Sequence, residues 1–430
     1  MSHTASGTIN TARCDYERYR RYLLIERYDH TDDMAECLAS IDKARQLLES
    51  HLVGPELWHG VIRRQVMAAV VHYSTAIEGN VLTRDQVESI IAGETIEVPE
   101  KDRTEALNCY KAMRWSQSRA QDAEWQLSSE SILTLQFMVG SDLGGSYEPL
   151  GRYREGQNTV EDRRTGEVIY WPPRATDVRP LMDELVEWIR RRSDGLTSPY
   201  VVNALAHLNF VAIHPFSDGN GRVARLLCSL LMMREGYKAQ AFWSLEQFLG
   251  EQAVDYGSVL AETLGPRWRP DQVLATDWIR WYLSAVAAQV SASERRMRRS
   301  LAEVAAVIGA MSASSDMPSD PKMYARFVMP VWLVLTAPDR SLARRRLSRY
   351  VNVSTQTLAR DLQHLKQQGL LTSRGRGRGA HYVPGPVVLS WGNFDQLVDL
   401  AEAAGLLGAS AVRGRIAQSR ESSPTLFEVS

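Results

Sequence analysis

Residues 213–225 place several reactive side chains in one short stretch, Ile-His-Pro-Phe-Ser-Asp-Gly-Asn-Gly-Arg-Val-Ala-Arg. His214 can accept a proton from a hydroxyl group near neutral pH. Asp218 offers the kind of carboxylate that Mg²⁺ binds together with phosphate oxygens. Arg222 and Arg225 are three positions apart, so on a helix they share roughly one face and can bind neighbouring phosphate groups. This combination predicts a phosphate site with a general base beside it.

The surrounding residues predict a turn that leads into a buried helix. Gly219 and Gly221 permit tight backbone conformations and a close approach to a ligand. The apolar run 226–233 follows at once and is typical of a core helix. The free N–H groups of that helix's first turn, together with the positive end of its dipole, would face an anion. A preceding helix, expected over 200–213, would deliver His214 to its C-terminal end.

The stretch resembles the signature of the Fic (filamentation induced by cyclic AMP) family: His-Pro-Phe, an acidic residue, Gly-Asn-Gly-Arg, two further residues and Arg. The resemblance implies an all-helical core that transfers AMP from ATP to a Ser, Thr or Tyr hydroxyl of a protein, itself included. It implies that His214 is the general base and that Asp218 binds Mg²⁺. The phosphate-binding residues implied in the same way are Gly219, Asn220, Gly221, Arg222 and, for the γ-phosphate, Arg225.

A second motif, Ser-Thr-Ala-Ile-Glu-Gly at residues 74–79, ends another predicted helix. A carboxylate at that end faces the negative end of the helix dipole, which costs a few tenths to about 1 kcal/mol. A compensating arginine is therefore expected; a solvated glutamate is the alternative. The pattern also resembles the inhibitory motif of Fic proteins with an N-terminal inhibitory helix, here about 61–80. That resemblance makes Ser74 and Glu78 inhibitory residues and implies that Glu78 pairs with Arg225 in place of the γ-phosphate.

Two short β-prone runs, 158–160 and 168–171, flank a glycine-containing turn and predict a β-hairpin. An edge hairpin without a specific role is one interpretation. In Fic proteins the matching hairpin, the flap, holds the hydroxyl-bearing segment of the target through main-chain hydrogen bonds. The residues expected to dock a target are Thr159, Val160, Val168, Ile169 and Tyr170.

The C-terminal part of the chain resembles a winged helix-turn-helix domain, with three helices followed by a β-wing. Between Asp339 and Arg378, nine Arg and one Lys stand against two Asp, in a chain whose formal net charge is −1. Such a local excess of positive charge is expected of a module that binds double-stranded DNA; protein contact is the alternative. The residues expected to contact DNA are Gln356, Thr357, Arg360, Arg376 and Arg378.

These signals divide the chain into five expected regions. They are an N-terminal helical region with the inhibitory helix (1–100), a Fic catalytic core (101–290), a basic helix and linker (291–321), a winged helix-turn-helix domain (322–390), and a short helix with a disordered tail (391–430). The expected fold class is mainly α, with a β-hairpin flap on an all-helical core and a small α+β domain at the C-terminus.

The bulk composition, 44% hydrophobic and 23% charged over 430 residues, is ordinary for a soluble protein. No apolar run reaches the ~18 residues of a membrane span, and no signal peptide is expected. Cys14, Cys37, Cys109 and Cys228 are far apart, which argues against a zinc or disulfide framework. We therefore expect a cytoplasmic protein without a membrane partner; whether it is a monomer or a homodimer stays open.

Two positions depart from the pattern typical of the family. Val211 stands where an acidic residue is common, and Asp255-Tyr256 stands where paired tyrosines are common. The second departure leaves the contacts to the nucleobase and ribose open. His207, within the helix before the motif, is interpreted as a core or supporting histidine.

The predicted function is thus a protein adenylyltransferase that uses ATP and Mg²⁺ and is inhibited by its own Glu78. Two alternatives stay open. The same glutamate could align a water molecule, so that the enzyme removes AMP from a modified protein by hydrolysis. The chain could also be a transcription regulator whose Fic core senses a nucleotide and whose C-terminal domain binds DNA.

Overall fold

The computed structural model describes residues 23–51, 56–147, 149–162, 165–192, 197–235, 245–314, 321–351, 353–375 and 380–405 of the chain. The chain is mainly helical and divides into two compact units. Unit 1 comprises Met1–Glu49 and Arg63–Ala292, and unit 2 comprises Ser50–Ile62 and Ser293–Ser430. None of the described helices is long and apolar enough to cross a membrane.

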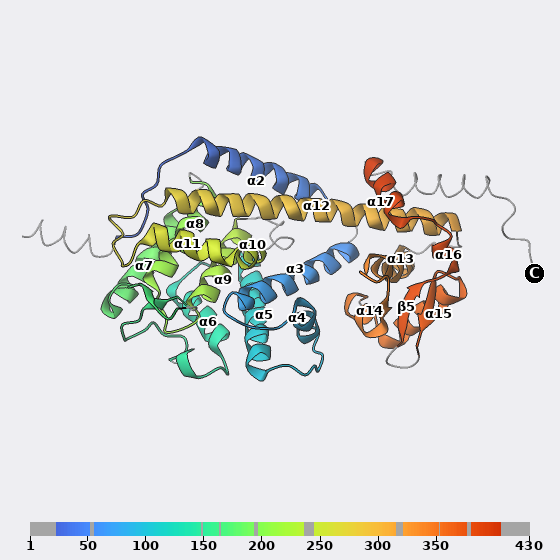
Figure 1. The fold of residues 1–430 in the computed structure, drawn as a ribbon, viewed down its shortest axis with the longest axis horizontal. Helices are drawn as coiled ribbons and strands as arrows, with labels where there is room; N and C mark the ends of the chain where they lie inside the picture. The colour runs from blue at the N-terminus through green and yellow to red at the C-terminus, as the bar shows by residue number, and fades with distance from the viewer. Residues whose placement is uncertain are drawn as a thin grey trace, which may run out of the picture. The chain divides into compact units, whose positions relative to one another are not determined.

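Unit 1 is a bundle of helices around one central helix. Its elements, wholly or mainly, are α2 (Asp32–Ser50), α3 (Glu56–Ala76), α4 (Arg84–Ile91), α5 (Glu100–Gln121), α6 (Ser129–Gly140), η1 (Gly145–Tyr147), α7 (Ala175–Arg192), α8 (Pro199–Ile213), α9 (Asn220–Arg234), α10 (Leu245–Glu251) and α11 (Ala253–Leu264). Helix α9 packs against α5, α6 and α8, as Figure 1 shows. Helices α8 and α9 are buried on every side, which is the pattern of a helix in the middle of a core.

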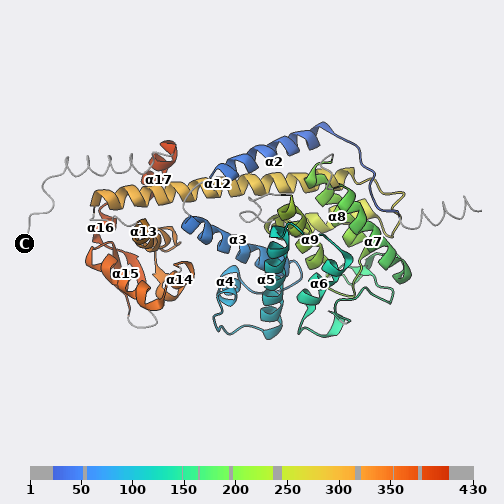
Figure 2. The ribbon, with the colours of Figure 1, turned by 180° about the vertical axis from the view of Figure 1, so that it is seen from behind.

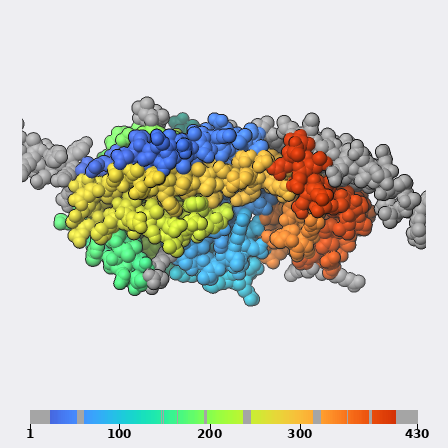
Figure 3. All heavy atoms as spheres, turned by 45° about the horizontal axis from the view of Figure 1, so that its top comes forward, coloured from blue at the N-terminus to red at the C-terminus, as the bar shows by residue number. Residues whose placement is uncertain are grey.

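Helix α2 lies along the first part of α12 (Thr276–Ser314), and Figure 3 shows this contact at the surface. Asp33 and Arg280 form an ion pair at 2.5 Å, and the backbone N–H of Asp29 donates to the hydroxyl of Thr276. Helix α12 continues through the boundary expected near residue 290 and passes into unit 2. The basic residues expected to begin a separate region therefore belong to the second half of one long helix.

The predicted hairpin consists of β1 (Val160–Glu161) and β2 (Val168–Tyr170), which pair antiparallel with an irregular register. The next residue, Trp171, is itself held by a neighbouring segment. Its N–H donates to the carbonyl of Pro266, and its carbonyl accepts from the N–H of Trp268. Chain from beyond α11 thus lies beside the end of the second strand.

Unit 2 combines a helical cluster with a small sheet. Its helices, besides the second half of α12, are α13 (Pro321–Thr336), α14 (Arg344–Tyr350), α15 (Thr355–Gln367), α16 (Pro386–Leu389) and α17 (Phe394–Ala403). Strands β3 (Leu342–Ala343), β4 (Leu371–Arg374) and β5 (His381–Pro384) form an antiparallel sheet in the order β3-β5-β4. A bidentate ion pair between Arg326 of α13 and Asp361 of α15, at 2.6 Å, ties these two helices together.

The acidic helix α17 packs on the basic part of α12 within unit 2 (Figure 2). Arg298 pairs with Glu402 at 2.5 Å, and Arg299 pairs with Asp399 at 2.6 Å. These two arginines are therefore neutralised by the protein itself.

Candidate active site

His214 is the residue that ends helix α8. It has a left-handed backbone conformation, φ 50° and ψ 60°, and its N–H closes the helix by donating to the carbonyl of Phe210. Its ring nitrogen Nδ1 lies 3.2 Å from the carbonyl of Val211, which requires a proton on Nδ1 and leaves Nε2 as the proton acceptor. Burial lowers the pKa of His214 to about 4, although the residue keeps some contact with solvent. The imidazole is therefore neutral at physiological pH and fit to act as a base.

The loop after His214 leads directly into the N-terminus of α9. Gly219 has φ 84°, a conformation that favours glycine, and it precedes the first helical residue. The side chain of Asn220 accepts from the N–H of Phe216 at 2.9 Å and donates to its carbonyl at 2.8 Å. The Asn220 amide thus closes the loop on itself, and only its backbone N–H is left to join an anion site with Gly221.

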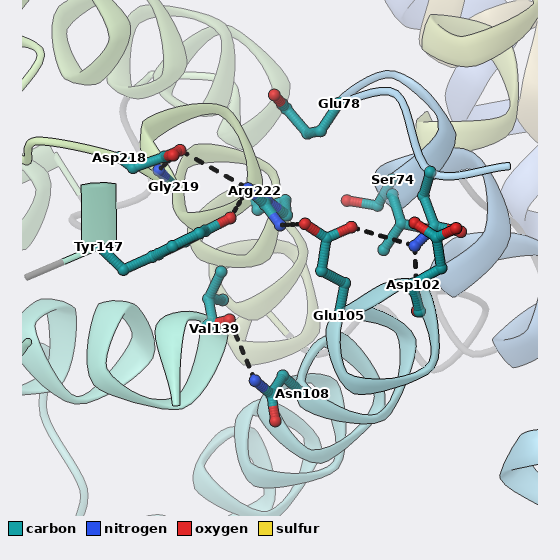
Figure 4. Close-up of polar contacts among 12 residues, drawn as sticks. Ser74, Glu78, Asp102, Glu105, Asn108, Val139, Tyr147, Asp218, Gly219 and Arg222 are labelled. Atoms are coloured by element: carbon teal, nitrogen blue, oxygen red, sulfur yellow. Dashed lines mark hydrogen bonds and ion pairs between the residues drawn. The ribbon is translucent and has the colours of Figure 1, made fainter. Parts of the chain in front are cut away.

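Arg222 lies buried in the first turn of α9, between two carboxylates and a tyrosine from three parts of the chain (Figure 4). Its guanidinium is 3.5 Å from the carboxylate of Glu105 on α5 and 3.6 Å from that of Asp218. It also donates to the hydroxyl of Tyr147 and lies over that ring at 5.1 Å from its centre. A cation held so deeply at a helix N-terminus is placed to bind an anion rather than to interact with solvent.

Arg225, one turn further along α9, is only 2% exposed and contacts the motif that ends α3. Its Nη2 is 2.9 Å from Oε1 of Glu78 and donates to the carbonyl of Ser74 at 2.8 Å, while Nε donates to the Ser74 hydroxyl at 3.1 Å. Helix α3 ends at Ala76, so Glu78 lies in the turn just beyond it. The structure therefore brings together three residues that the sequence placed in two separate motifs.

The absence of a side chain at Gly221 makes this contact possible. A Cβ atom there would lie 2.4 Å from Oε1 of Glu78, closer than real Cβ atoms approach another atom. Glu78 thus reaches the first turn of α9, where the phosphates of a nucleotide are expected. The Glu78 carboxylate and a nucleotide phosphate group would therefore compete for the same contact with Arg225.

The turn that carries Glu78 has a second attachment through Asn80. The Asn80 amide donates to Oε2 of Glu105 and to the carbonyl of Asp102, both at 3.0 Å. Glu105 in turn faces Arg222, so one buried carboxylate joins the Glu78 turn to the first turn of α9. This connection was not predicted, because no local pattern indicates that Glu105 contacts Asn80 or Arg222.

The predicted flap residues divide into two groups. Val168 and Ile169 are exposed, at 43% and 41%, and Thr159 and Val160 are half-buried at the start of the hairpin. Tyr170 faces inward instead: its side chain is buried, and its hydroxyl donates to the carbonyl of Ala212 at 2.9 Å. Tyr170 therefore anchors the hairpin to α8, and its side chain is not available to a target.

Helix α8 also carries a buried aromatic and polar cluster behind the site. His207 stacks on Trp278 and lies 2.8 Å from the hydroxyl of Tyr256 through Nε2. Burial lowers the pKa of His207 to about 3 and raises that of Tyr256 to about 12. Both groups are thus neutral, in agreement with the interpretation of His207 as a core histidine.

Asp218, the residue expected to hold Mg²⁺, lies in the loop before α9. Asp218 is the one carboxylate of the His214–Arg225 motif, and the described residues contain no cluster of three or more His, Cys, Asp or Glu that could hold a metal. A single partly exposed carboxylate suits Mg²⁺ when phosphate oxygens supply other ligands.

Of the residues expected to contact DNA, Gln356, Thr357 and Arg360 lie in the first turns of α15, whereas Arg376 and Arg378 fall outside the described residues.

Residues 126–232, which span α6 to α9, match the Fic/DOC family. The chain is 31% identical over 207 residues to the protein adenylyltransferase Fic of Nematostella vectensis, covering 47% of this chain and 45% of that protein. It is 32% identical over 210 residues to the protein adenylyltransferase Fic of Drosophila willistoni, covering 46% and 38%. The chain thus spans less than half the length of these curated relatives.

Solved structures give the same fold. The crystal structure of a Fic family protein from Desulfovibrio desulfuricans G20 matches with a TM-score of 0.55 at 22% identity, covering 85% of this chain and 99% of that one. The match of residues 126–232 to the Fic/DOC family agrees with the resemblance of the sequence motifs, and the expected mainly helical fold class is confirmed.

Proposed function

We propose that the chain is a protein adenylyltransferase, which moves AMP from ATP to a hydroxyl group of a protein. The observation that carries the proposal is the neutral His214 imidazole beside the N-terminus of α9, where two buried arginines lie within the first two turns. This combination supplies a proton acceptor and a phosphate-binding site. The sequence relatives named protein adenylyltransferases support the same reaction.

In the proposed reaction His214 Nε2 takes the proton of the target hydroxyl. The hydroxyl oxygen then forms a bond to the α-phosphorus of ATP, the bond from that phosphorus to the bridging oxygen breaks, and pyrophosphate leaves. Backbone N–H groups of Gly219 to Gly221 and the guanidinium of Arg222 would stabilise the phosphate charge. The rate gain comes from positioning and from charge stabilisation, as in phosphoryl transfer generally.

Asp218 is the residue that would hold Mg²⁺ in this site, next to Arg222. The cation would neutralise phosphate charge when it is bound. Asp218 is also placed to keep the loop ordered, because it accepts a hydrogen bond from the N–H of Gly219. Its carboxylate thus has a structural role independent of the cation.

The contact between Glu78 and Arg225 supports self-inhibition as part of the proposal. While Glu78 is paired, Arg225 is not available to the γ-phosphate, and ATP would bind with its α-phosphate wrongly set for attack. Hydrolytic removal of AMP by the same glutamate is the competing reaction of this site. Both reactions depend on His214 but make opposite use of Glu78.

Mass spectrometry of the Glu78→Gly protein incubated with ATP and Mg²⁺ tests the proposal. The expected product is the protein itself carrying AMP on a Ser, Thr or Tyr, and the His214→Ala, Glu78→Gly double variant should carry none. The fragment masses identify both the nucleotide and the modified residue. Absence of any adduct on the single variant and on added proteins would contradict the proposal.

Loosening the Glu78 turn should relieve inhibition in part. Asn80→Ala removes the hydrogen bonds to Glu105 and to Asp102. Leaving a buried polar partner unsatisfied costs about 1–3 kcal/mol, so the inhibited arrangement should weaken by roughly ten-fold. We expect initial rates of AMP transfer about ten-fold above wild type. An exposed change nearby, Glu97→Ala, serves as the control, and equal rates for all three proteins would contradict the role of Asn80.

A second function, DNA binding by unit 2, is proposed from the exposed face of α15. Gln356, Arg360 and Gln363 are exposed on this helix, whereas its one acidic residue, Asp361, is buried in the ion pair with Arg326. The outward face is therefore polar and basic without an acid. Together with three helices and a three-stranded sheet, this arrangement resembles a winged helix-turn-helix domain, whose second helix of the motif enters the major groove.

Fluorescence anisotropy of labelled duplexes, including the DNA upstream of the protein's own gene, measures this binding. Log affinity should fall with log salt concentration with a slope near −4.5 if about five phosphates are contacted. Arg360→Ala should weaken binding, while Arg114→Ala, an exposed change in unit 1, should not. If the full-length protein binds no duplex even at low salt, unit 2 does not bind DNA and protein contact becomes its proposed role.

A further inference from the structure

We infer that Arg154 is a positioning residue that holds the flap hairpin (158–171) in register with the base His214. The inference rests on the proposed AMP transfer, in which the flap presents the target hydroxyl. Arg154 contacts none of the residues expected to bind phosphate. It would act through the backbone of His214 and not on the reacting atoms.

The Arg154 side chain is buried and makes all its polar contacts with backbone carbonyls. It is 4% exposed, and it donates from Nε to the carbonyl of His214 at 2.9 Å, from Nη1 to that of Gly156 at 3.0 Å, and from Nη2 to that of Pro173 at 2.6 Å. Its own backbone N–H donates to the carbonyl of Pro215 at 2.9 Å. Each of the three guanidinium nitrogens therefore donates to a different backbone carbonyl.

No carboxylate of the described residues forms an ion pair with Arg154, and burial lowers its pKa to about 10. A buried cation without a counter-ion is costly unless hydrogen bonds compensate. The planar fork of a guanidinium can reach several carbonyls in fixed directions, which the single nitrogen of lysine cannot. The contacts of Arg154 thus depend on the shape of its side chain as well as on its charge.

The three carbonyls that accept from Arg154 belong to the ends of the flap and to His214, which must lie close together for the transfer. Gly156 precedes the flap and Pro173 follows it, so Arg154 joins both ends of the hairpin. The third acceptor is the carbonyl of His214, whose left-handed backbone is unfavourable for a residue with a side chain and needs support from its surroundings. The Arg154 side chain therefore holds both ends of the flap and also the left-handed backbone of His214, which carries the catalytic ring.

Two contacts beyond Arg154 continue the same junction. Asn158 donates to the carbonyl of Phe216 at 3.1 Å, and the hydroxyl of Tyr170 donates to that of Ala212 at 2.9 Å. Each of these joins a single point of the hairpin to α8 or to the loop after it. Arg154 differs from them because it touches both ends of the flap and His214 at once.

Loss of Arg154 should therefore lower the rate of transfer without weakening ATP binding. A misplacement of about 1 Å between reacting groups costs about a hundred-fold in rate. Nucleotide affinity depends on the first turn of α9, which Arg154 does not contact. A merely structural residue would instead lower stability, affinity and rate together.

The test compares Arg154→Gln and Arg154→Lys in the Glu78→Gly protein, with Arg152→Gln as the matched control because Arg152 is exposed two positions away. Single-turnover self-modification at saturating ATP and Mg²⁺ measures transfer, calorimetry measures the Kd for ATP, and hydrogen exchange reports on 156–173 and on α9. We expect Arg154→Gln to transfer about a hundred-fold and Arg154→Lys about ten-fold more slowly. Both should bind ATP within about two-fold of the parent.

Hydrogen exchange should rise in the flap of both Arg154 variants and stay unchanged in α9, with no change for Arg152→Gln. Parent-like transfer, or a parallel loss of ATP binding and of α9 protection in both variants, would overturn the inference. If Glu78→Gly itself transfers nothing, the proposed function fails, and exchange alone then decides on Arg154. A selective rise in the flap supports the positioning role, and unchanged flap exchange rejects it.

Discussion

Replacing Glu78 by glycine is expected to raise AMP transfer by about two to three orders of magnitude. The carboxylate of Glu78 lies 2.9 Å from Nη2 of Arg225, with the two side chains 15% and 2% exposed. Breaking a buried ion pair from one side changes the free energy by about 3–5 kcal/mol, and each ~1.4 kcal/mol is a factor of ten in rate. Because Glu78 keeps some contact with water, the lower part of that range is expected.

The glycine variant should also keep its fold, because Arg225 keeps its other hydrogen-bond partner, Ser74. The hydroxyl and carbonyl of Ser74 continue to accept from Arg225 when Glu78 is removed. Gly221 would then face an open space that a phosphate group can occupy, since a Cβ at that position meets chiefly Glu78. In the variant, a phosphate group of the nucleotide thus replaces the Glu78 carboxylate as the anion beside Arg225.

Initial rates with ATP labelled at the α-phosphate measure this effect. Glu78→Gln separates charge from shape, since it keeps the side chain's size and should give an intermediate rate. Glu97→Gly, an exposed change beyond the motif, should match wild type. Equal rates for wild type and Glu78→Gly would contradict self-inhibition. Release of AMP from pre-modified protein by wild type alone would favour the removal reaction.

The two motifs were predictable because each is a local pattern with complementary chemistry. Glu78 was expected to pair with a cation and Arg225 with an anion. In the structure these two side chains, 147 positions apart in the sequence, contact each other. Arg154 and Tyr147 could not be predicted in the same way. Their contacts with His214 and Arg222 span 60 and 75 positions, and neither lies in a periodic or charged pattern that indicates a partner.

Local rules also gave an incomplete account of His214 itself. A residue before proline is normally pushed toward extended conformations, yet His214 precedes Pro215 and is left-handed. Its role as the residue that closes α8, supported by Arg154, overrides that preference. The conformation of the catalytic residue therefore depends on tertiary contacts, which a sequence pattern does not contain.

Charge patterns were similarly incomplete in unit 2. The basic run in α12 looks exposed in sequence, but acidic residues of α17 about a hundred positions away neutralise Arg298 and Arg299. The positive charge expected for DNA binding lies between Asp339 and Arg378, so the pairing of these two arginines leaves it unchanged. Asp395 of α17 lies 3.9 Å from Arg340, so within that stretch a part of the positive charge is also paired.

Replacing His214 by alanine in the Glu78→Gly protein is expected to abolish detectable transfer. A positioned general base contributes about 10²–10⁴-fold to a proton-transfer step. The described structure offers no substitute in the same place, since His207, the other histidine of α8, is buried in the cluster with Tyr256 and Trp278. ATP binding should be retained, because the first turn of α9 is unchanged. The exposed His30→Ala variant is the control. Transfer by His214→Ala at the parent rate would exclude His214 as the base.

The pH dependence of kcat/KM tests whether His214 acts as a proton acceptor in its buried setting. Burial lowers its pKa from 6.5 to about 4, and only the neutral ring can accept the proton of the hydroxyl. Because kcat/KM reports on the free enzyme, the acidic limb of the Glu78→Gly profile should lie near pH 4 and the rate should stay flat between about pH 5.5 and 7.5. A limb near pH 6.5 would mean that the ring is solvated in the active protein. The hydrogen bond from Nδ1 to Val211 would then not hold it in the site during turnover, and the base would have to be positioned by the substrate.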